Sequence, residues 1–173
     1  VLGSAKHFPG HGDTAKDSHK TLPTINFTSE RLNEVELYPF RSVAKSIASV
    51  MVGHLNVPAL EPKQGLPSSL SKVIITDLLK TKMGYEGLIF TDALGMKGVS
   101  EYLPVGEVEV AAFLAGNDIL LMPSDLPKGF EAIKKAYQKK RISEERLAHS
   151  VKKILMAKYK VGLTSFTPLV EKD

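Results

Sequence analysis

The chain has 173 residues, of which 43% are hydrophobic and 24% are charged, a composition typical of one globular domain with a buried core. It contains no cysteine, which excludes disulfides, thiolate nucleophiles and cysteine-based zinc sites but leaves the cellular compartment, cytoplasmic or exported, undecided. The formal charge of +4 does not indicate nucleic-acid binding, because most of the excess lies within residues 128–160, where basic and apolar residues alternate at helical spacing.

Four short apolar runs follow one another along the chain. They are rich in Val, Ile, Leu or Met, as buried parallel strands are, and they cover residues 1–7, 49–55, 87–92 and 118–122. None of them approaches the roughly 20 residues that a membrane-spanning helix needs. The runs therefore predict four buried strands and no membrane segment.

Segments of helical periodicity separate these runs. Ser29 and Ser71 are typical helix-starting residues, and apolar residues follow each of them at helical spacing. Further helices are predicted over residues 107–115, near residues 127–139 and over about residues 143–160. This repeated alternation of strand and helix predicts a parallel α/β fold.

Polar residues stand at the carboxyl ends of three predicted strands. Lys6 and His7 end the first run, His54 ends the second and Asp92 ends the third. A (β/α)₈ TIM barrel places its chemistry at this end of its strands. The chain has no dinucleotide-binding glycine fingerprint and no phosphate-binding loop, so we favour the barrel over a nucleotide-binding sheet. The four or so βα units present would make half of an eightfold barrel.

The loop after the first run carries a specific motif. Residues 6–12 read Lys-His-Phe-Pro-Gly-His-Gly, and residues 17–19 read Asp-Ser-His. This pattern resembles the signature of the bacterial β-N-acetylglucosaminidases, or β-hexosaminidases, of glycoside hydrolase family 3. A second, independent match at residues 87–96 resembles the strand that carries the nucleophile in this family. The resemblance covers about residues 1–163 and implies the C-terminal half of the catalytic TIM barrel, followed at residues 164–173 by a tail or a linker toward a possible further domain.

The resemblance also assigns roles to individual residues. A retaining glycosidase needs a carboxylate that attacks the anomeric carbon and a second group that protonates the leaving oxygen and later activates water. By resemblance, Asp92 is the nucleophile, His19 is the acid/base and Asp17 orients His19. An imidazole can serve both steps because it titrates near neutral pH. Lys6 and His7 would bind sugar hydroxyls, and no metal or cofactor is expected.

Other residues near the site admit more than one interpretation. His54 either lines the site as a substrate-binding residue or packs within the barrel. Met96 either lines the sugar-binding pocket or belongs to the hydrophobic core. His7 and His11 have the i, i+4 spacing of zinc ligands on a helix, but the proline and glycine between them break such a helix, so a metal site is disfavoured.

The resemblance implies an enzyme that removes terminal β-linked N-acetylglucosamine through a covalent glycosyl-Asp intermediate. The expected substrates are peptidoglycan-derived muropeptides or chitooligosaccharides. Phosphorolysis on the same scaffold and a non-catalytic sugar-binding barrel domain remain as alternatives. The upstream half of the barrel is the expected partner, and we expect the 173-residue chain to be inactive without it.

Overall fold

The computed structural model describes residues 1–11, 14 and 21–163. Three parallel strands form its sheet in the order β1-β2-β3, with β1 at Ser4–Phe8, β2 at Ser49–Val52 and β3 at Leu88–Thr91. The register of β2 and β3 is regular, whereas that of β1 and β2 shifts between Ala5 and Phe8. The first three predicted strands are therefore confirmed, each shorter than its apolar run.

The fourth apolar run lies beside β3 but pairs less regularly. A single parallel bridge joins Phe90 to Ile119. The backbone amide of Asp118 donates to the carbonyl of Ile89, at 2.8 Å, and the amide of Ile89 donates back to the Asp118 carboxylate, at 3.0 Å. A side chain thus takes a hydrogen bond that a regular ladder would give to the backbone, so this run continues the sheet without forming a full strand.

Helical segments follow each strand, as the periodicity predicts. They are α1 (Ser29–Arg31), η1 (Leu32–Glu36) and α2 (Tyr38–Val43) after β1; η2 (Ser68–Leu70) and η3 (Val73–Lys82) after β2; α3 (Lys97–Ser100) and α4 (Glu107–Ala115) after β3; and α5 (Leu126–Gln138) and α6 (Glu144–Lys160) after the fourth run. The described residues contain no helix that is both long enough and apolar enough to cross a membrane.

Local chemistry explains where several of these helices begin and end. The side chain of Ser143 accepts a hydrogen bond from the amide of Arg146 and caps the start of α6. Gly116 ends α4 with a φ of 125°, a conformation that residues with a Cβ rarely adopt. In η3 the amide of Met83 donates to the carbonyl of Leu78, five residues back, so this turn is wider than that of an α-helix.

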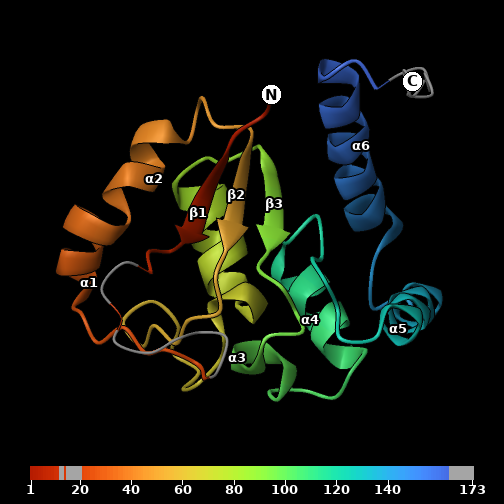
Figure 1. Cartoon of the computed structure of the whole chain (residues 1–173), viewed down its shortest axis with the longest axis horizontal. Helices are drawn as coiled ribbons and strands as arrows, with labels where there is room; N and C mark the ends of the chain where they lie inside the picture. Colours follow the sequence, from red (N-terminus) through yellow and green to blue (C-terminus); the bar gives the residue numbers. More distant parts are fainter. Residues whose placement is uncertain (12–13, 15–20, 164–173) are drawn as a thin grey trace, which may run out of the picture.

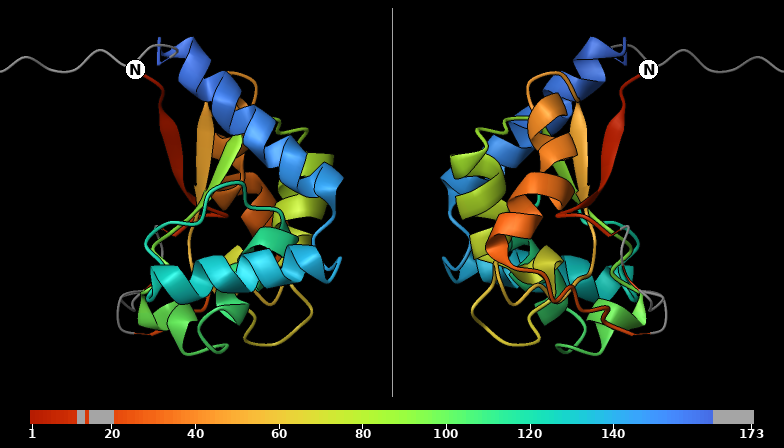
Figure 2. Two further views of the ribbon diagram at one scale, coloured as in Figure 1. Left: turned by 90° about the vertical axis from the view of Figure 1, so that its right-hand side faces the viewer. Right: turned by 90° about the vertical axis from the view of Figure 1, so that its left-hand side faces the viewer.

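The sheet and its helices enclose the main core. Figure 1 shows the three strands side by side, with α1 and α2 near β1 and α6 on the other side, beyond β3. Figure 2 shows η3 on one side of the sheet. Ile74, Ile75 and Leu79 of η3 pack in one buried cluster with Val50 of β2 and Ile89 of β3. This packing holds the carboxyl ends of the three strands at one edge of the sheet.

Candidate active site

The carboxyl ends of the three strands bring a small set of polar residues together. His7 lies on β1, His54 follows β2 by two residues and Asp92 directly follows β3. The Nε2 atom of His7 is 3.7 Å from Oδ2 of Asp92. This distance exceeds that of a normal hydrogen bond, so the contact is an ion pair when the imidazole is protonated. The structure therefore assembles the strand-end cluster that the sequence predicts.

Asp92 is held at the end of β3 by its own backbone. Its amide donates to the carbonyl of Val52, at 2.9 Å, which continues the pairing of β2 and β3 by one residue. Its Oδ1 atom accepts a hydrogen bond from the amide of Ala93, at 2.8 Å. The side chain is 17% exposed. One carboxylate oxygen is thus anchored, while Oδ2 is the oxygen near His7.

The position of His7 depends on a close approach of β1 to the end of β2. The amide of Gly53 donates to the carbonyl of Phe8, at 2.9 Å. A Cβ atom on Gly53 would lie 3.2 Å from Cβ of His7, which is tighter than ordinary packing. The Phe8 ring is fully buried and packs edge to face against Phe40, with centroids 5.1 Å apart. The missing side chain of Gly53 and the anchored Phe8 ring together set where His7 lies.

His54 is the fully buried member of this cluster and has no exposed surface. Its Nδ1 atom is 2.7 Å from Oγ of Ser69, and its Nε2 atom is 3.0 Å from the carbonyl oxygen of Ala93. Burial lowers the pKa of His54, and this effect exceeds the opposite effects of the hydrogen bond to Ala93 and of the Asp92 charge. Both ring nitrogens are bonded within the protein, which favours the packing interpretation of His54 over a sugar contact.

The remaining predicted site residues differ in what the structure shows of them. Lys6 lies on β1 with an exposed side chain. Met96 is buried at the start of α3, and its amide donates to the carbonyl of Ala93, at 3.0 Å. Asp17 and His19 lie outside the described residues, so their roles stay predictions. The part of the chain that the structure describes holds no group of three His, Asp or Glu residues placed to bind a metal ion.

Sequence patterns did not single out Ser69 or the Ala93 backbone as parts of this region. Ser69 lies in η2 and is fully buried, although a serine that follows Pro67 and Ser68 reads as an exposed turn residue. Ala93 contributes only backbone atoms, which no side-chain motif reports. The signal available in the sequence was a histidine at a predicted strand end, because a histidine that is buried there requires two polar partners for its ring nitrogens.

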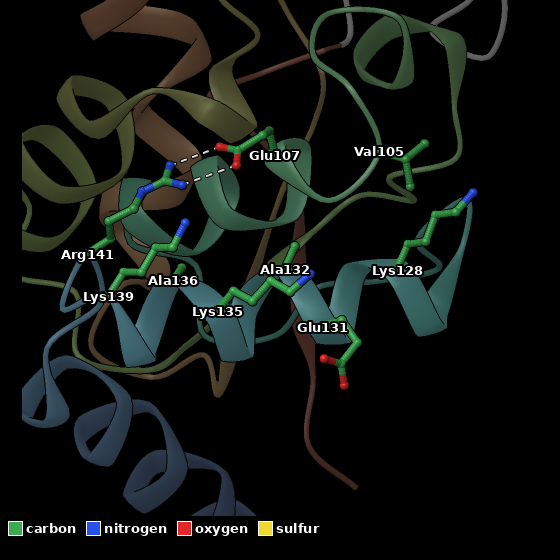
Figure 3. Close-up of a pocket in the computed structure, with 9 residues that line it drawn as sticks. All are labelled: Val105, Glu107, Lys128, Glu131, Ala132, Lys135, Ala136, Lys139 and Arg141. Carbon is green, nitrogen blue, oxygen red and sulfur yellow. Dashed lines mark hydrogen bonds and ion pairs between the residues drawn. The ribbon is translucent and has the colours of Figure 1, made fainter.

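A hollow of about 310 Å³ lies between α4 and α5, away from the strand ends. Figure 3 shows Lys128, Lys135 and Lys139 along its wall, with Arg141 bonded to both carboxylate oxygens of Glu107, at 3.1 and 2.9 Å. None of its lining residues belongs to the strand-end cluster. We therefore place the candidate active site at the strand ends and not in this hollow.

Comparison with known proteins supports the resemblance over nearly the whole chain. Residues 1–157 match the family model described as "Glycosyl hydrolase family 3 N terminal domain". Beta-hexosaminidase A of Pseudoalteromonas piscicida is 33% identical over 186 residues, covering 95% of this chain and 31% of that protein. The solved structure of a glycoside hydrolase family 3 beta-N-acetylglucosaminidase from Paenibacillus sp. str. FPU-7 is 39% identical, with a TM-score of 0.93, and the match covers 99% of this chain and 33% of that one.

A solved structure with a different activity in its name also matches. The beta-glucoside phosphorylase BglX is 25% identical with a TM-score of 0.88, and the match covers 94% of this chain and 31% of that one. The chain thus spans about a third of the length of the proteins it matches. The matched solved domains have a TIM-barrel-like fold, which confirms the predicted fold class.

Proposed function

Because the chain belongs to glycosyl hydrolase family 3, we propose that the protein containing it is a retaining glycosidase that removes terminal β-linked N-acetylglucosamine. The observation that carries this proposal is the placement of Asp92 at the carboxyl end of β3, with one carboxylate oxygen anchored and the other near His7. This is the end of the strands at which barrels of this type carry out their chemistry. The beta-hexosaminidase and beta-N-acetylglucosaminidase names of the matched proteins support the choice of sugar.

In the proposed reaction, Oδ2 of Asp92 attacks the anomeric carbon and forms a covalent glycosyl ester. The bond to the leaving oxygen breaks, and His19 gives its proton to that oxygen. His19 then takes a proton from water, the water oxygen attacks the anomeric carbon, and the bond to Asp92 breaks, so that the sugar leaves with its original configuration. Asp17 orients the imidazole, while Lys6 and His7 bind sugar hydroxyls.

We propose peptidoglycan-derived muropeptides as the preferred substrates and chitooligosaccharides as the alternative. The support is the residue 6–19 motif, which resembles that of family members acting on peptidoglycan fragments. The test compares kcat/KM of the complete protein on N-acetylglucosaminyl-β-1,4-N-acetylmuramic acid and on N,N′-diacetylchitobiose. A higher kcat/KM for chitobiose would overturn the preference for peptidoglycan fragments while leaving the glycosidase proposal intact.

The nucleophile is tested by covalent trapping. A 5-fluoro N-acetylglucosaminyl fluoride should accumulate as an ester on Asp92. The fluorine at C5 slows both formation and hydrolysis of the ester, whereas the fluoride leaving group speeds its formation alone. Mass spectrometry of proteolytic peptides would locate the label. A label on another carboxylate would overturn the assignment of Asp92, and the absence of any turnover of aryl β-N-acetylglucosaminides by the complete protein would overturn the proposed function.

Phosphorolysis is the second candidate, and the match to a beta-glucoside phosphorylase supports it. An imidazole acid/base would repel an incoming phosphate less than a second carboxylate would, because a neutral imidazole carries no negative charge. The complete protein would be assayed with and without inorganic phosphate. Formation of N-acetylglucosamine 1-phosphate in place of free sugar would favour this activity over hydrolysis.

A further inference from the structure

A continuous set of hydrogen bonds links buried residues to the turn that carries Asp92. The Nε2 atom of His54 contacts the carbonyl of Ala93, at 3.0 Å, and the amide of Ala93 donates to Oδ1 of Asp92, at 2.8 Å. On the other side of the ring, Nδ1 contacts Oγ of Ser69, at 2.7 Å, and the carbonyl of Ser69 accepts from Nδ2 of Asn117, at 2.9 Å. Segments that follow β2, β3 and α4 are thereby joined through one imidazole.

The chemistry of these partners defines the tautomer of the ring. A carbonyl oxygen can only accept, so Nε2 of His54 carries the hydrogen and donates to Ala93. The neutral ring then accepts at Nδ1 from the hydroxyl of Ser69. Burial lowers the pKa of His54 despite the nearby carboxylate of Asp92, while the charge of His7 adds to the lowering, so the neutral form is favoured.

The carbonyl of Ala93 stabilises the turn after β3 in two ways. It accepts from the amide of Met96, at 3.0 Å, as well as from His54. The peptide that bears this carbonyl and the peptide that bears the Ala93 amide meet at the same Cα atom. Steric contacts allow only some combinations of the two torsions at this Cα, so an imidazole that fixes the first peptide plane narrows the orientations open to the second, which donates to Asp92. Both ring nitrogens are bonded and the ring has no exposed surface, so the hydrogen-bonded route from His54 to Asp92 runs through this peptide.

We propose that His54 is a positioning residue that holds the Ala93 peptide, and through it the Asp92 carboxylate, in the orientation needed for attack on the anomeric carbon. This inference rests on the proposed function, in which Asp92 is the nucleophile. It differs from a sugar contact, which would require a ring nitrogen open to the substrate. It also differs from simple packing, which an apolar side chain of similar size could provide.

Two amide substitutions separate the two hydrogen bonds of the ring. In His54→Gln the longer side chain can place its NH₂ group where Nε2 lies and keep the donor to Ala93. In His54→Asn the shorter amide can reach Ser69 but leaves the Ala93 carbonyl without this donor. His149→Gln, an exposed histidine of α6, is the matched control. All variants would be made in the complete protein.

We expect His54→Asn to slow covalent labelling of Asp92 and to lower kcat about 10- to 100-fold, the scale of a misplaced reacting group, with KM little changed. His54→Gln should recover most of this loss, and His149→Gln should behave as the wild type. If kcat falls equally in His54→Asn and His54→Gln, and both variants lose the same thermal stability, His54 serves only in packing. A rise in KM without a fall in kcat would show a sugar contact. Either result would overturn the inference.

The hydrogen bond itself is tested without reference to catalysis. The ¹⁵N NMR signals of the His54 ring can be assigned in the wild-type protein because they are missing from the spectrum of His54→Gln. Their chemical shifts should show a neutral ring with the hydrogen on Nε2. A ring with hydrogen on Nδ1, or a charged ring at neutral pH, would overturn the inference even if the protein hydrolyses its substrate. Conversely, failure of the wild type to turn over β-N-acetylglucosaminides would reject the proposed function, and this measurement would still report on the bond to Ala93.

Discussion

Asp92 presents two inequivalent oxygens. Oδ1 accepts from the Ala93 amide, whereas Oδ2 is the oxygen near His7. Asp92→Asn keeps the shape of the side chain but removes the negative charge that attacks the sugar. We expect kcat of the complete protein to fall on the order of 10⁴-fold, the scale seen when a hydrolase loses one catalytic group.

An aryl β-N-acetylglucosaminide assay would measure the effect of this substitution. Asp77→Asn is the control, because Asp77 is an exposed carboxylate of η3 and should leave kcat unchanged. Turnover of Asp92→Asn at the rate of the wild type would contradict the role of Asp92 as the nucleophile.

The proposed acid/base is tested by varying the leaving group. His19→Ala should slow substrates with poor leaving groups most, because an activated aryl group scarcely needs a proton. The measurement compares the fall in kcat/KM for a nitrophenyl glycoside with that for a natural disaccharide. Asp17→Asn should give the same pattern in a milder form. Equal losses for both substrates would instead indicate a binding role for His19.

The lowered pKa of His54 also predicts a pH dependence of stability. Above the ordinary histidine pKa of 6.5, the ring is neutral in both the folded and the unfolded chain. As the pH falls below this value, the unfolded chain binds a proton that the folded protein excludes, so the free energy of unfolding should fall until the lower folded pKa is passed. Urea unfolding between about pH 5 and pH 8 would measure this.

His54→Gln provides the comparison for this measurement, because the other titrating groups are common to both proteins. The wild type should lose stability relative to His54→Gln as the pH falls through this window. A difference between the two proteins that stays constant with pH, or that changes in the opposite direction, would contradict a folded pKa below 6.5.

The sequence predicted which residues of the candidate site lie near one another better than the contacts between them. His7, His54 and Asp92 could be placed together because the carboxyl ends of parallel strands meet at one end of the sheet. Lys6, expected beside them, lies in the middle of β1. The orientation of the His54 ring could not be predicted, since it depends on Ser69 and on a backbone carbonyl that are distant in sequence. Side-chain type reports chemistry, but hydrogen-bond partners depend on how the segments pack.

At the scale of elements, one buried carboxylate joins α6 to the sheet. Oδ1 of Asp118 accepts from Oγ of Ser150, at 2.6 Å, and Oδ2 accepts from the amide of Ile89 and from Nζ of Lys153, at 3.0 and 2.5 Å. Arg146 adds an ion pair with Oδ1, at 3.6 Å. The three α6 residues are spaced at i, i+4 and i+7, so they share one face of the helix.

These contacts predict a large loss of stability in Asp118→Asn. Burial alone would raise the pKa of the Asp118 carboxyl, but hydrogen bonds from Lys153 and Ser150 and the positive charges of Lys153 and Lys80 lower it below its usual range. Removing the negative charge of the buried carboxylate leaves the partly buried cations Lys153 and Arg146 without a counter-charge, and breaking such a pair costs about 3–5 kcal/mol. Urea unfolding would measure the change, with the exposed Glu145→Gln of α6 as control. A loss below about 1 kcal/mol, the size of an exposed pair, would contradict a buried network.

The elements themselves followed from the sequence where local signals were strong. The predicted bounds of α4 agree with the structure, since Gly116 supplies a clear stop. The fourth run was predicted as a strand like the others, but part of its pairing uses the Asp118 side chain and Thr91 hydroxyl, which apolar periodicity does not reveal. The wide turns of η1 and η3 carry no distinct periodic signal either, because the apolar spacing there also fits an α-helix.

At the scale of the whole molecule, two surfaces of the described chain lack a partner. β1 is an edge of the three-stranded sheet and pairs there only with β2. The helix α6 exposes Val151, Leu155 and Tyr159, which are spaced four residues apart on one face. An open strand edge and an exposed apolar face both favour association with further chain. The match covers about a third of each of the matched relatives, so each has further chain outside the matched region.

We therefore expect the 173-residue chain, prepared alone, to self-associate and to be inactive on an aryl β-N-acetylglucosaminide. Light scattering would measure its mass, and a colorimetric assay its turnover. Replacing Val151, Leu155 and Tyr159 with serine should reduce the association without abolishing it, because the edge of β1 remains open. Inactivity is expected even for a soluble monomer, since catalysis depends on precise positioning of the sugar and half a barrel surrounds it on one side only. A monodisperse monomer that turns over substrate at the rate of the complete protein would show that the site does not extend beyond this chain.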